Sequence, residues 1–319
     1  MFKVSVVVPV YGAERFIEKC CLSLFGQSLD GIEYIFVDDC TQDRSMEILN
    51  NTLRKFPHRK ACIKILHNTT NRGVAESRKL GVKASTGEFV IHCDPDDYVD
   101  IYAYEKLYIC AKKNKYDIVS CDFYRVYDNE ELKLVSEVRQ EDIIKQLIIG
   151  QRQGSLCNRL IRGNIARSNN IVFPVQNIGE DLILVLQYYY YSYQWGDLCE
   201  PLYYYNHNPE SITSFGSRSK LSSQANEMTG MLEKMIQLLS EKGLLRKYSK
   251  EIVARKFFNK RWILPAIRNA RDCSLWIKIH PDINLSLYAN PYLSLQDKIT
   301  SLLVELRVYP LLKKIIRKR

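Results

Sequence analysis

Short apolar runs alternate with helical patterns through the first hundred residues, and this alternation constrains the fold most strongly. The run Val4 to Val8 is nearly all β-branched and ends at Pro9, which is typical of a strand buried on both faces of a parallel sheet. Similar runs occupy residues 34–37, 63–66 and 88–92, and the segments 14–25, 41–53 and 74–84 have helical spacing. This order predicts an α/β fold with a mostly parallel sheet flanked by helices.

The carboxyl ends of the predicted strands carry polar and acidic residues. Ligands of parallel sheets bind beyond these ends, which meet at one edge of the sheet. The first strand ends in the sequence P-V-Y, the second in Asp38 and Asp39, and the fourth in Asp94, Asp96 and Asp97. The sequence therefore predicts that three strand ends converge on one ligand site.

The three acids at 94–97 repel one another, so they need a cation, basic side chains or water around them. Mg²⁺ and Mn²⁺ prefer oxygen ligands, and Mg²⁺ usually takes one or two carboxylates plus the phosphates of a substrate. The converging strand ends favour a metal-diphosphate site, and a solvated turn that bends at Pro95 is the alternative. The sequence argues against a dinucleotide site, because no G-x-G-x-x-G follows the first strand. It also argues against a P-loop, because the chain contains no G-x-x-x-x-G-K-[ST].

Composition indicates an ordinary soluble globular protein, with 46% hydrophobic and 26% charged residues. The ten cysteines show neither C-x-x-C pairs nor zinc spacing, which favours a reduced, cytosolic chain. The first apolar run is interrupted by a proline and resembles a strand more than a signal peptide. No apolar stretch approaches the roughly 20 residues that span a bilayer, so a transmembrane helix is not expected.

The net charge of +10 is concentrated near the C-terminus. Residues 241–319 hold 18 Lys and Arg against 6 Asp and Glu, whereas the preceding residues hold 28 against 30. This distribution argues against a nucleic-acid surface and for a local anionic partner. Apolar residues at helical spacing (Val308, Leu311, Leu312, Ile315, Ile316) lie beside five basic ones in the last segment. Such a tail suits an anionic membrane surface, with plain solvated charge as the alternative.

Four segments in order resemble family 2 glycosyltransferases of the GT-A fold. They are S-V-V-V-P-V-Y-G-A-E at 5–14, F-V-D-D-C-T-Q-D at 36–43, N-R-G-V-A-E-S-R-K-L-G at 71–81 and A-S-T-G-E-F-V-I-H-C-D-P-D-D at 84–97. Segments at 156–161, 179–181 and 203–213 resemble bacterial surface-polysaccharide enzymes more loosely. The last hundred residues match no pattern that we can name.

The resemblance implies a nucleotide-sugar site at the ends of the first two strands. Asp39 would accept the N–H of the base and Tyr11 would pack against its ring, with a helix cap as the alternative for Asp39. Arg78 would meet the diphosphate, with a solvated arginine on a helix as the alternative. The remaining positions implied for the donor are Pro9, Val10, Glu14, Asp38, Asn71, Gly73 and Asp94.

The resemblance also makes Asp94 and Asp96 the D-x-D element. Asp96 would bind Mn²⁺ or Mg²⁺ directly, Asp94 would contact the ribose or a metal-bound water, and Asp97 would be a further ligand or simply the strand end. The ion would stabilise the charge that builds on the departing phosphate.

A base must take the proton of the acceptor hydroxyl as that hydroxyl attacks the anomeric carbon. The resemblance favours Asp181 as this base, with Glu180 second, and implies inversion at the anomeric carbon. The alternative is structural, since acids at the start of a helix suit its dipole.

Residues 1–125 are expected to form the nucleotide-sugar-binding half, 126–218 the acceptor-binding half and 219–319 a helical extension. Two tyrosine clusters, 188–191 and 203–205, could stack on sugars, although core packing explains such clusters more often. Trp195 and His207 are weaker acceptor candidates.

The sequence thus predicts a cytosolic enzyme, either free or peripheral on the inner membrane face. It would move a sugar from a nucleotide diphosphate sugar, with UDP favoured, to a glycan or lipid-linked acceptor. Two alternatives stay open. One is another nucleotide-diphosphate enzyme such as a nucleotidyltransferase, and the other is a non-catalytic scaffold of the same fold.

Overall fold

The computed structural model describes residues 2–127, 131–137, 142–174, 179–206 and 218–316. The chain divides into two compact units, which we describe separately. The first unit comprises residues 1–144 and 153–214, and the second comprises residues 145–152 and 215–319.

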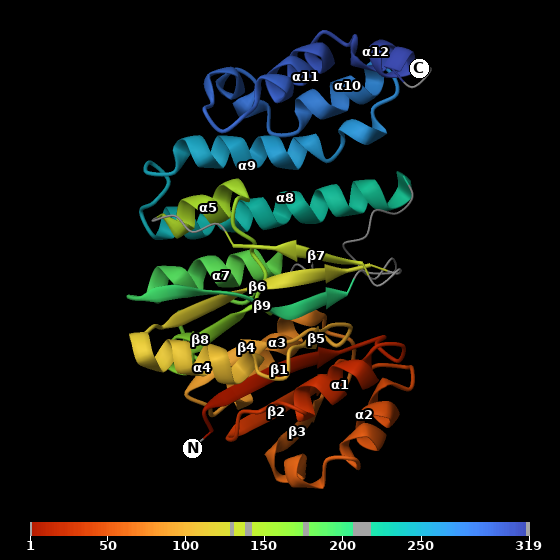
Figure 1. Ribbon diagram of the computed structural model, residues 1–319. Coiled ribbons are helices and arrows are strands. Elements are labelled where there is room, and N and C mark those ends of the chain that lie inside the picture. Colours follow the sequence, from red (N-terminus) through yellow and green to blue (C-terminus); the bar gives the residue numbers. More distant parts are fainter. Residues whose placement is uncertain (1, 128–130, 138–141, 175–178, 207–217, 317–319) are drawn as a thin grey trace. The chain divides into compact units, whose positions relative to one another are not determined.

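The first unit is built on one sheet with the strand order β3-β2-β1-β4-β8-β6-β9-β5, and β7 pairs with β6 (Figure 1). Four parallel strands form one half of it, as predicted: β1 (Val4–Val10), β2 (Ile32–Asp38), β3 (Ile63–His67) and β4 (Phe89–His92). The helices between them are α1 (Ile17–Phe25), α2 (Ser45–Leu53), η1 (Pro57–Cys62) and α3 (Val74–Ala84). The first helix begins three residues later than residue 14, because the Glu14 N–H donates to the Asp43 carboxylate of the neighbouring loop (2.9 Å).

The other half of the sheet is mixed. Its strands are β5 (Tyr98–Val99), β6 (Ile118–Val126), β7 (Leu132–Val135), β8 (Arg159–Arg162) and β9 (Trp195–Asn206). The strand β8 runs antiparallel to both β4 and β6, whereas β9 runs parallel to β6. The helices of this half are α4 (Ala103–Asn114), α6 (Gly163–Ala166) and α7 (Glu180–Tyr191).

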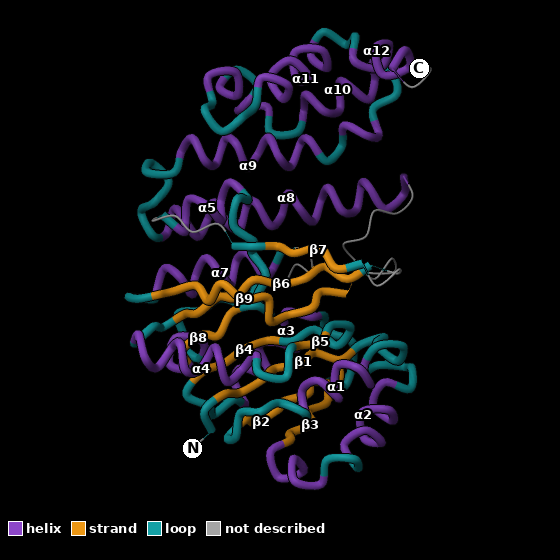
Figure 2. The backbone as a smooth tube through the Cα atoms, in the orientation of Figure 1, coloured by secondary structure: helices purple, strands orange, loops and turns teal. Residues whose placement is uncertain are grey.

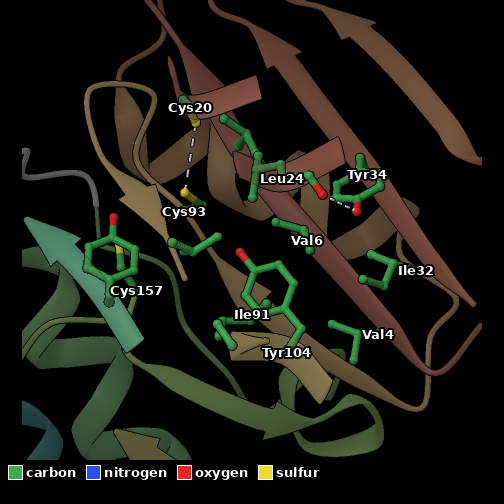
Figure 3. Close-up of a cluster of buried hydrophobic side chains, with 14 of the residues drawn as sticks. Val4, Val6, Cys20, Leu24, Ile32, Tyr34, Ile91, Cys93, Tyr104 and Cys157 are labelled. Atoms are coloured by element: carbon green, nitrogen blue, oxygen red, sulfur yellow. Dashed lines mark hydrogen bonds between the residues drawn. The ribbon is translucent and has the colours of Figure 1, made fainter. Parts of the chain in front are cut away.

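Alternate residues of β1 face opposite sides of the sheet. Val4 and Val6 pack with α1 in the main apolar core, where Tyr34 donates a hydrogen bond to the Leu24 carbonyl (Figure 3). On the other side α3 lies so close that a Cβ on Gly81 would come within 2.4 Å of a Val7 methyl. The two helical layers bury both faces of β1, which explains why its sequence is continuously apolar.

The second unit consists of helices joined by loops (Figure 2), which confirms the predicted helical C-terminal region. Its elements are most of α5 (Ile143–Ile149), which begins in the first unit, and α8 (Arg218–Glu241), α9 (Ser249–Arg261), η2 (Leu264–Ala266), α10 (Ala270–Lys278), η3 (Pro281–Ile283), η4 (Ser286–Ala289), α11 (Leu295–Glu305) and α12 (Tyr309–Ile316). Trp276 is fully buried at its centre, and its indole N–H donates to the Lys260 carbonyl (3.1 Å). Within the described ranges, no helix is both long and apolar enough to cross a membrane.

Candidate active site

Arg78, on α3, joins the candidate acids of two distant segments. Its guanidinium donates to Asp94 after β4 (2.7 Å), to Glu180 at the start of α7 (2.7 Å) and to Asp181. The side chain is almost completely buried. Burial opposes the charge, but Asp181, Asp94 and Glu180 together hold the pKa of Arg78 well above its ordinary value. The structure thus places Asp94 and Asp181, the candidate base, on one cation.

The start of α7 is shaped by glycine. Gly179 has φ of +79°, a left-handed conformation that glycine adopts without steric cost. Glu180 and Asp181 then occupy the first turn, as predicted, and the Leu156 N–H donates to the second oxygen of Asp181 (3.3 Å).

Burial shifts the pKa of both acids of this turn upward. It raises the pKa of Glu180 to about 8, with the neighbouring Asp181 adding to the effect and Arg78 opposing it. Burial also raises the pKa of Asp181, which Arg78 counteracts and Asp94 reinforces. Glu180 is therefore mostly protonated at neutral pH, and a protonated carboxyl cannot accept another proton.

The acids after β4 differ in their surroundings. Asp94 is partly exposed, and its second oxygen accepts a hydrogen bond from the Cys157 thiol (3.2 Å). Asp96 is half-buried. Asp97 is buried and accepts hydrogen bonds from the Tyr203 hydroxyl and from the Asn206 N–H (2.8 Å), both on β9. Burial, together with Asp96 and Asp94, raises the pKa of Asp97 well above its ordinary value.

The end of β2 is tied to the loop that precedes α3. Asp39 accepts hydrogen bonds from the Arg72 and Gly73 N–H groups (2.9 and 2.8 Å) and from the Asn68 amide (2.7 Å). Gly73 is the N-cap of α3, so Asp39 supports the start of that helix. The helix-cap alternative expected Asp39 to serve α2, the helix that follows it directly. Asp39 instead supports α3, which begins 35 residues later.

The other positions around this loop are more accessible. Asp38 accepts the Thr41 N–H (2.9 Å) and lies 3.0 Å from a ring nitrogen of His67. Asn71 is exposed and accepts the Gly73 N–H (3.1 Å), and Gly73 has φ of +86°.

The end of β1 presents one exposed aromatic ring. Pro9 and Val10 are buried within the strand, whereas Tyr11, the next residue, is 55% exposed. Glu14 is exposed and accepts the Arg44 N–H (3.0 Å) from the loop before α2.

The carboxylates fit a divalent ion only in part. Within the described residues, no group of three or more His, Cys, Asp and Glu side chains could hold a metal by itself. Mg²⁺ sites commonly use one or two carboxylates and take their remaining ligands from substrate phosphates and water. Asp96 with Asp94 supplies the two carboxylates of this pattern, but both oxygens of Asp94 already accept hydrogen bonds, from Arg78 and the Cys157 thiol. Both oxygens of Asp97 likewise accept hydrogen bonds, from β9.

Two residues contact the acids although the sequence did not predict those contacts. Cys157 and Tyr203 both lie in segments that carry the resemblance, yet neither has a spacing that indicates a partner. Tyr203 bonds to Asp97 and its oxygen accepts the Asp94 N–H (3.3 Å). These contacts arise because β8 and β9 return beside β4 and β5.

The tyrosine clusters mainly serve packing. Tyr188, Tyr189 and Tyr203 are buried, and Tyr204 stacks on Tyr98 with ring centres 4.6 Å apart. Tyr190 is 41% exposed. Trp195 begins β9 at the strand end opposite to Tyr203, and His207 lies outside the described residues.

Comparison with known proteins identifies the family. Glycosyl transferase family 2 matches residues 5–168 of the 319. The uncharacterised glycosyltransferase EpsJ of Bacillus subtilis (strain 168) is 32% identical over 220 residues, which cover 66% of this chain and 62% of EpsJ. The alignment therefore spans less than two thirds of that relative.

Two solved structures share the fold. S. aureus TarS 1–349 in complex with UDP-GlcNAc has a TM-score of 0.56 and 18% identity, covering 86% of this chain and 84% of TarS. The mannosyltransferase PcManGT from Pyrobaculum calidifontis, in complex with GDP-Man and Mn²⁺, has a TM-score of 0.58 and 13% identity, covering 99% of this chain and 88% of PcManGT. The predicted family and fold are both confirmed: this chain belongs to glycosyl transferase family 2 and has the GT-A fold.

Proposed function

We propose that this protein is an inverting glycosyltransferase that moves a sugar from a nucleotide diphosphate sugar to a hydroxyl group of a glycan or lipid-linked acceptor. The observation that carries the proposal is the bridge of Arg78 between Asp94 and Asp181. It brings the acid that starts the D-x-D element close to a second acid that can serve as base. Membership of the family argues against the nucleotidyltransferase alternative.

The donor would lie across the ends of β1, β2 and β4. The exposed ring of Tyr11 is available to pack against the base, and the exposed Glu14 is accessible for polar contacts. Asp38, whose side chain is 15% exposed, would reach the donor at the edge of its contacts with Thr41 and His67. Asp39 would act mainly by holding the loop 68–73 in place, since three donors of that loop already occupy it. UDP is the preferred nucleotide because TarS binds UDP-GlcNAc, and the GDP-Man complex of PcManGT makes GDP the second choice.

Asp96, with Asp94, would hold Mn²⁺ or Mg²⁺ together with the diphosphate. The ion, when bound, supplies positive charge that stabilises the departing phosphate. Asp97 would position the loop by its bonds to β9. Arg78 would keep Asp94 and Asp181 at a fixed separation and limit their repulsion.

Asp181 would accept the proton of the acceptor hydroxyl as its oxygen attacks the anomeric carbon. The bond from that carbon to the diphosphate oxygen breaks, and the nucleoside diphosphate leaves from the opposite side, so the configuration inverts. The raised pKa of Asp181 suits a base, because proton transfer is more favourable when the pKa of the base lies nearer the working pH.

The acceptor side and the membrane complete the proposal. Residues 1–125 would bind the donor, 126–218 the acceptor, and the basic segment at 308–319 would contact an anionic membrane surface. The protein would then work in the cytoplasm, peripherally on the inner membrane face.

The decisive experiment incubates the protein with UDP-, GDP- and dTDP-sugars and measures release of the nucleoside diphosphate with Mn²⁺, Mg²⁺ or EDTA. We expect release from one donor class only, and only with a divalent ion. Release that persists in EDTA would refute the metal role. If no donor raises the melting temperature, the non-catalytic scaffold becomes the better explanation.

A further inference from the structure

The helix α11 exposes an apolar face where a polar one is expected. Leu295, Ile299, Leu302 and Leu306 are 74%, 48%, 45% and 62% exposed. Their spacing of four, three and four residues puts the first three on one side of the helix, and Leu306, the C-cap, continues the row; we call these four residues the α11 stripe. The opposite side is anchored, because Val304 is fully buried in the core of this unit.

Exposed apolar residues are ordinary when scattered, whereas a continuous row of large ones marks an interaction site. The stripe is continuous along the whole of α11. In the following helix, α12, Leu311 and Leu312 are also 62% and 39% exposed. This concentration of exposed leucines indicates a surface that binds another molecule or a membrane.

The charges of α11 identify the kind of partner. Its two acids are engaged internally: Asp297 closes the capping box with Ser294, and Glu305 accepts the Tyr288 hydroxyl (2.7 Å). The neighbouring bases, Lys298 and Arg307, form hydrogen bonds through their backbone N–H groups, but their side chains form no hydrogen bond or ion pair within the part of the chain that the structure describes. Asp297 also pairs with Arg261 (3.4 Å), so among the described residues Lys298 and Arg307 remain as two positive side chains beside the stripe with no acid paired to them.

The end of the stripe supports this assignment. Arg307 directly follows Leu306 and has φ of +62°, a conformation that glycine adopts more easily than other residues. The chain nevertheless carries an exposed arginine there, next to an exposed leucine. A basic group is thus presented at the margin of the apolar surface.

We propose that the α11 stripe inserts into the interfacial layer of an anionic membrane, with Lys298 and Arg307 contacting the lipid headgroups. Helices that lie in a bilayer surface combine these features, an apolar face and flanking bases. A second copy of the chain fits less well. Stable interfaces take about 20–30 residues from each partner, and two copies of this positive surface would repel each other.

The inference rests on the membrane partner proposed above but not on sugar transfer. It also differs from the basic segment at 308–319, because it assigns binding to apolar insertion by α11. Vesicle binding and nucleoside diphosphate release are separate measurements, so either proposal can fail alone.

The test compares two double variants of the full chain in flotation with phosphatidylcholine vesicles, with and without phosphatidylglycerol. The first is Ile299→Gln/Leu302→Gln, in the stripe. The matched control is Leu132→Gln/Leu134→Gln on β7, where the native leucines are 48% and 52% exposed. We expect the wild type to bind the anionic vesicles, the stripe variant to bind about tenfold more weakly, and the control to bind within about twofold of the wild type.

Circular dichroism melting establishes that both variants are folded, and exposed positions should tolerate the changes. The proposal is wrong if the wild type does not bind anionic vesicles, if the stripe variant binds them like the wild type, or if binding falls equally in both variants. It is also wrong if sedimentation shows a dimer that the stripe substitutions abolish while vesicle binding is absent. Loss of binding only on truncation after Pro310 would assign the membrane contact to the basic segment instead.

Discussion

Arg78 donates a hydrogen bond to Asp181, a residue 103 positions away along the chain. The same guanidinium holds Asp94, so α3, the end of β4 and the start of α7 meet at one buried cation. Three acids around one arginine leave a surplus of negative charge, and burial makes that surplus expensive. The group is therefore both a structural and a chemical centre of the first unit.

Replacement of Asp181 by Asn should lower the rate of sugar transfer by a factor of about 10²–10⁴, because the amide cannot take the proton from the acceptor hydroxyl. Donor binding, followed by thermal shift, should change little. Glu180→Gln is the matched control, and it should keep most of the activity because Glu180 is mostly protonated at neutral pH. The opposite pattern, an active Asp181→Asn and an inactive Glu180→Gln, would make Glu180 the base.

Replacement of Arg78 by Gln should destabilise the fold by about 3–5 kcal/mol, because it leaves buried acids without their cation. The loss should grow as pH rises and more of these acids ionise. Urea unfolding at pH 6 and pH 8 measures it. Arg72→Gln is the control, since Arg72 is exposed and its pair with Glu76 (3.5 Å) is a surface contact worth under about 1 kcal/mol. Equal effects of the two substitutions would contradict the central role of Arg78.

The stability should depend on pH through Glu180. Its pKa is about 8 in the folded protein and about 4.3 in an unfolded chain. Between these values the folded state holds the proton and the unfolded state does not, so the free energy of unfolding falls as pH rises. Glu180→Gln cannot titrate, and its stability should decline less between pH 5 and pH 8. Parallel curves for the wild type and the variant would show that the Glu180 carboxyl is not shifted.

Asp96 and Asp97 should behave differently although they are neighbours. Asp96→Asn should weaken activation by Mn²⁺ or Mg²⁺ and leave the melting temperature nearly unchanged. Asp97→Asn should lower the melting temperature, because Asp97 accepts bonds from Tyr203 and Asn206 inside the first unit. Metal titration of activity and calorimetry of both variants distinguish these outcomes. If Asp97→Asn changes only the metal dependence, Asp97 is a ligand.

The loop that Asp39 holds gives a further prediction. Asp39→Asn can no longer accept all three donors of residues 68–73, and it should cost about 1–3 kcal/mol of stability. The Michaelis constant for the donor should rise as the loop loosens. Chemical denaturation and donor kinetics test both effects. If the stability does not change, Asp39 acts only by binding the base of the donor.

Local sequence patterns determined most of the first unit's framework. The β-branched run at Val4 and the helical spacing of 74–84 depend on neighbours two to four positions apart, so periodicity alone revealed them. The acids at Asp94, Asp96 and Asp181 were found from motifs, which record residue types at fixed short spacings.

Only the tertiary structure decided which of these residues meet. Nothing in the spacing of Arg78 indicates that it bridges Asp94 and Asp181, or that Asp97 turns toward Tyr203 on β9. Those contacts follow from the reversal of β8 beside β4 and from the pairing of β5 with β9. The sequence could not predict the exposed side of α11 for the same reason. It shows that the helix has apolar residues on one face, but only packing decides which face is buried and which is free to bind a partner.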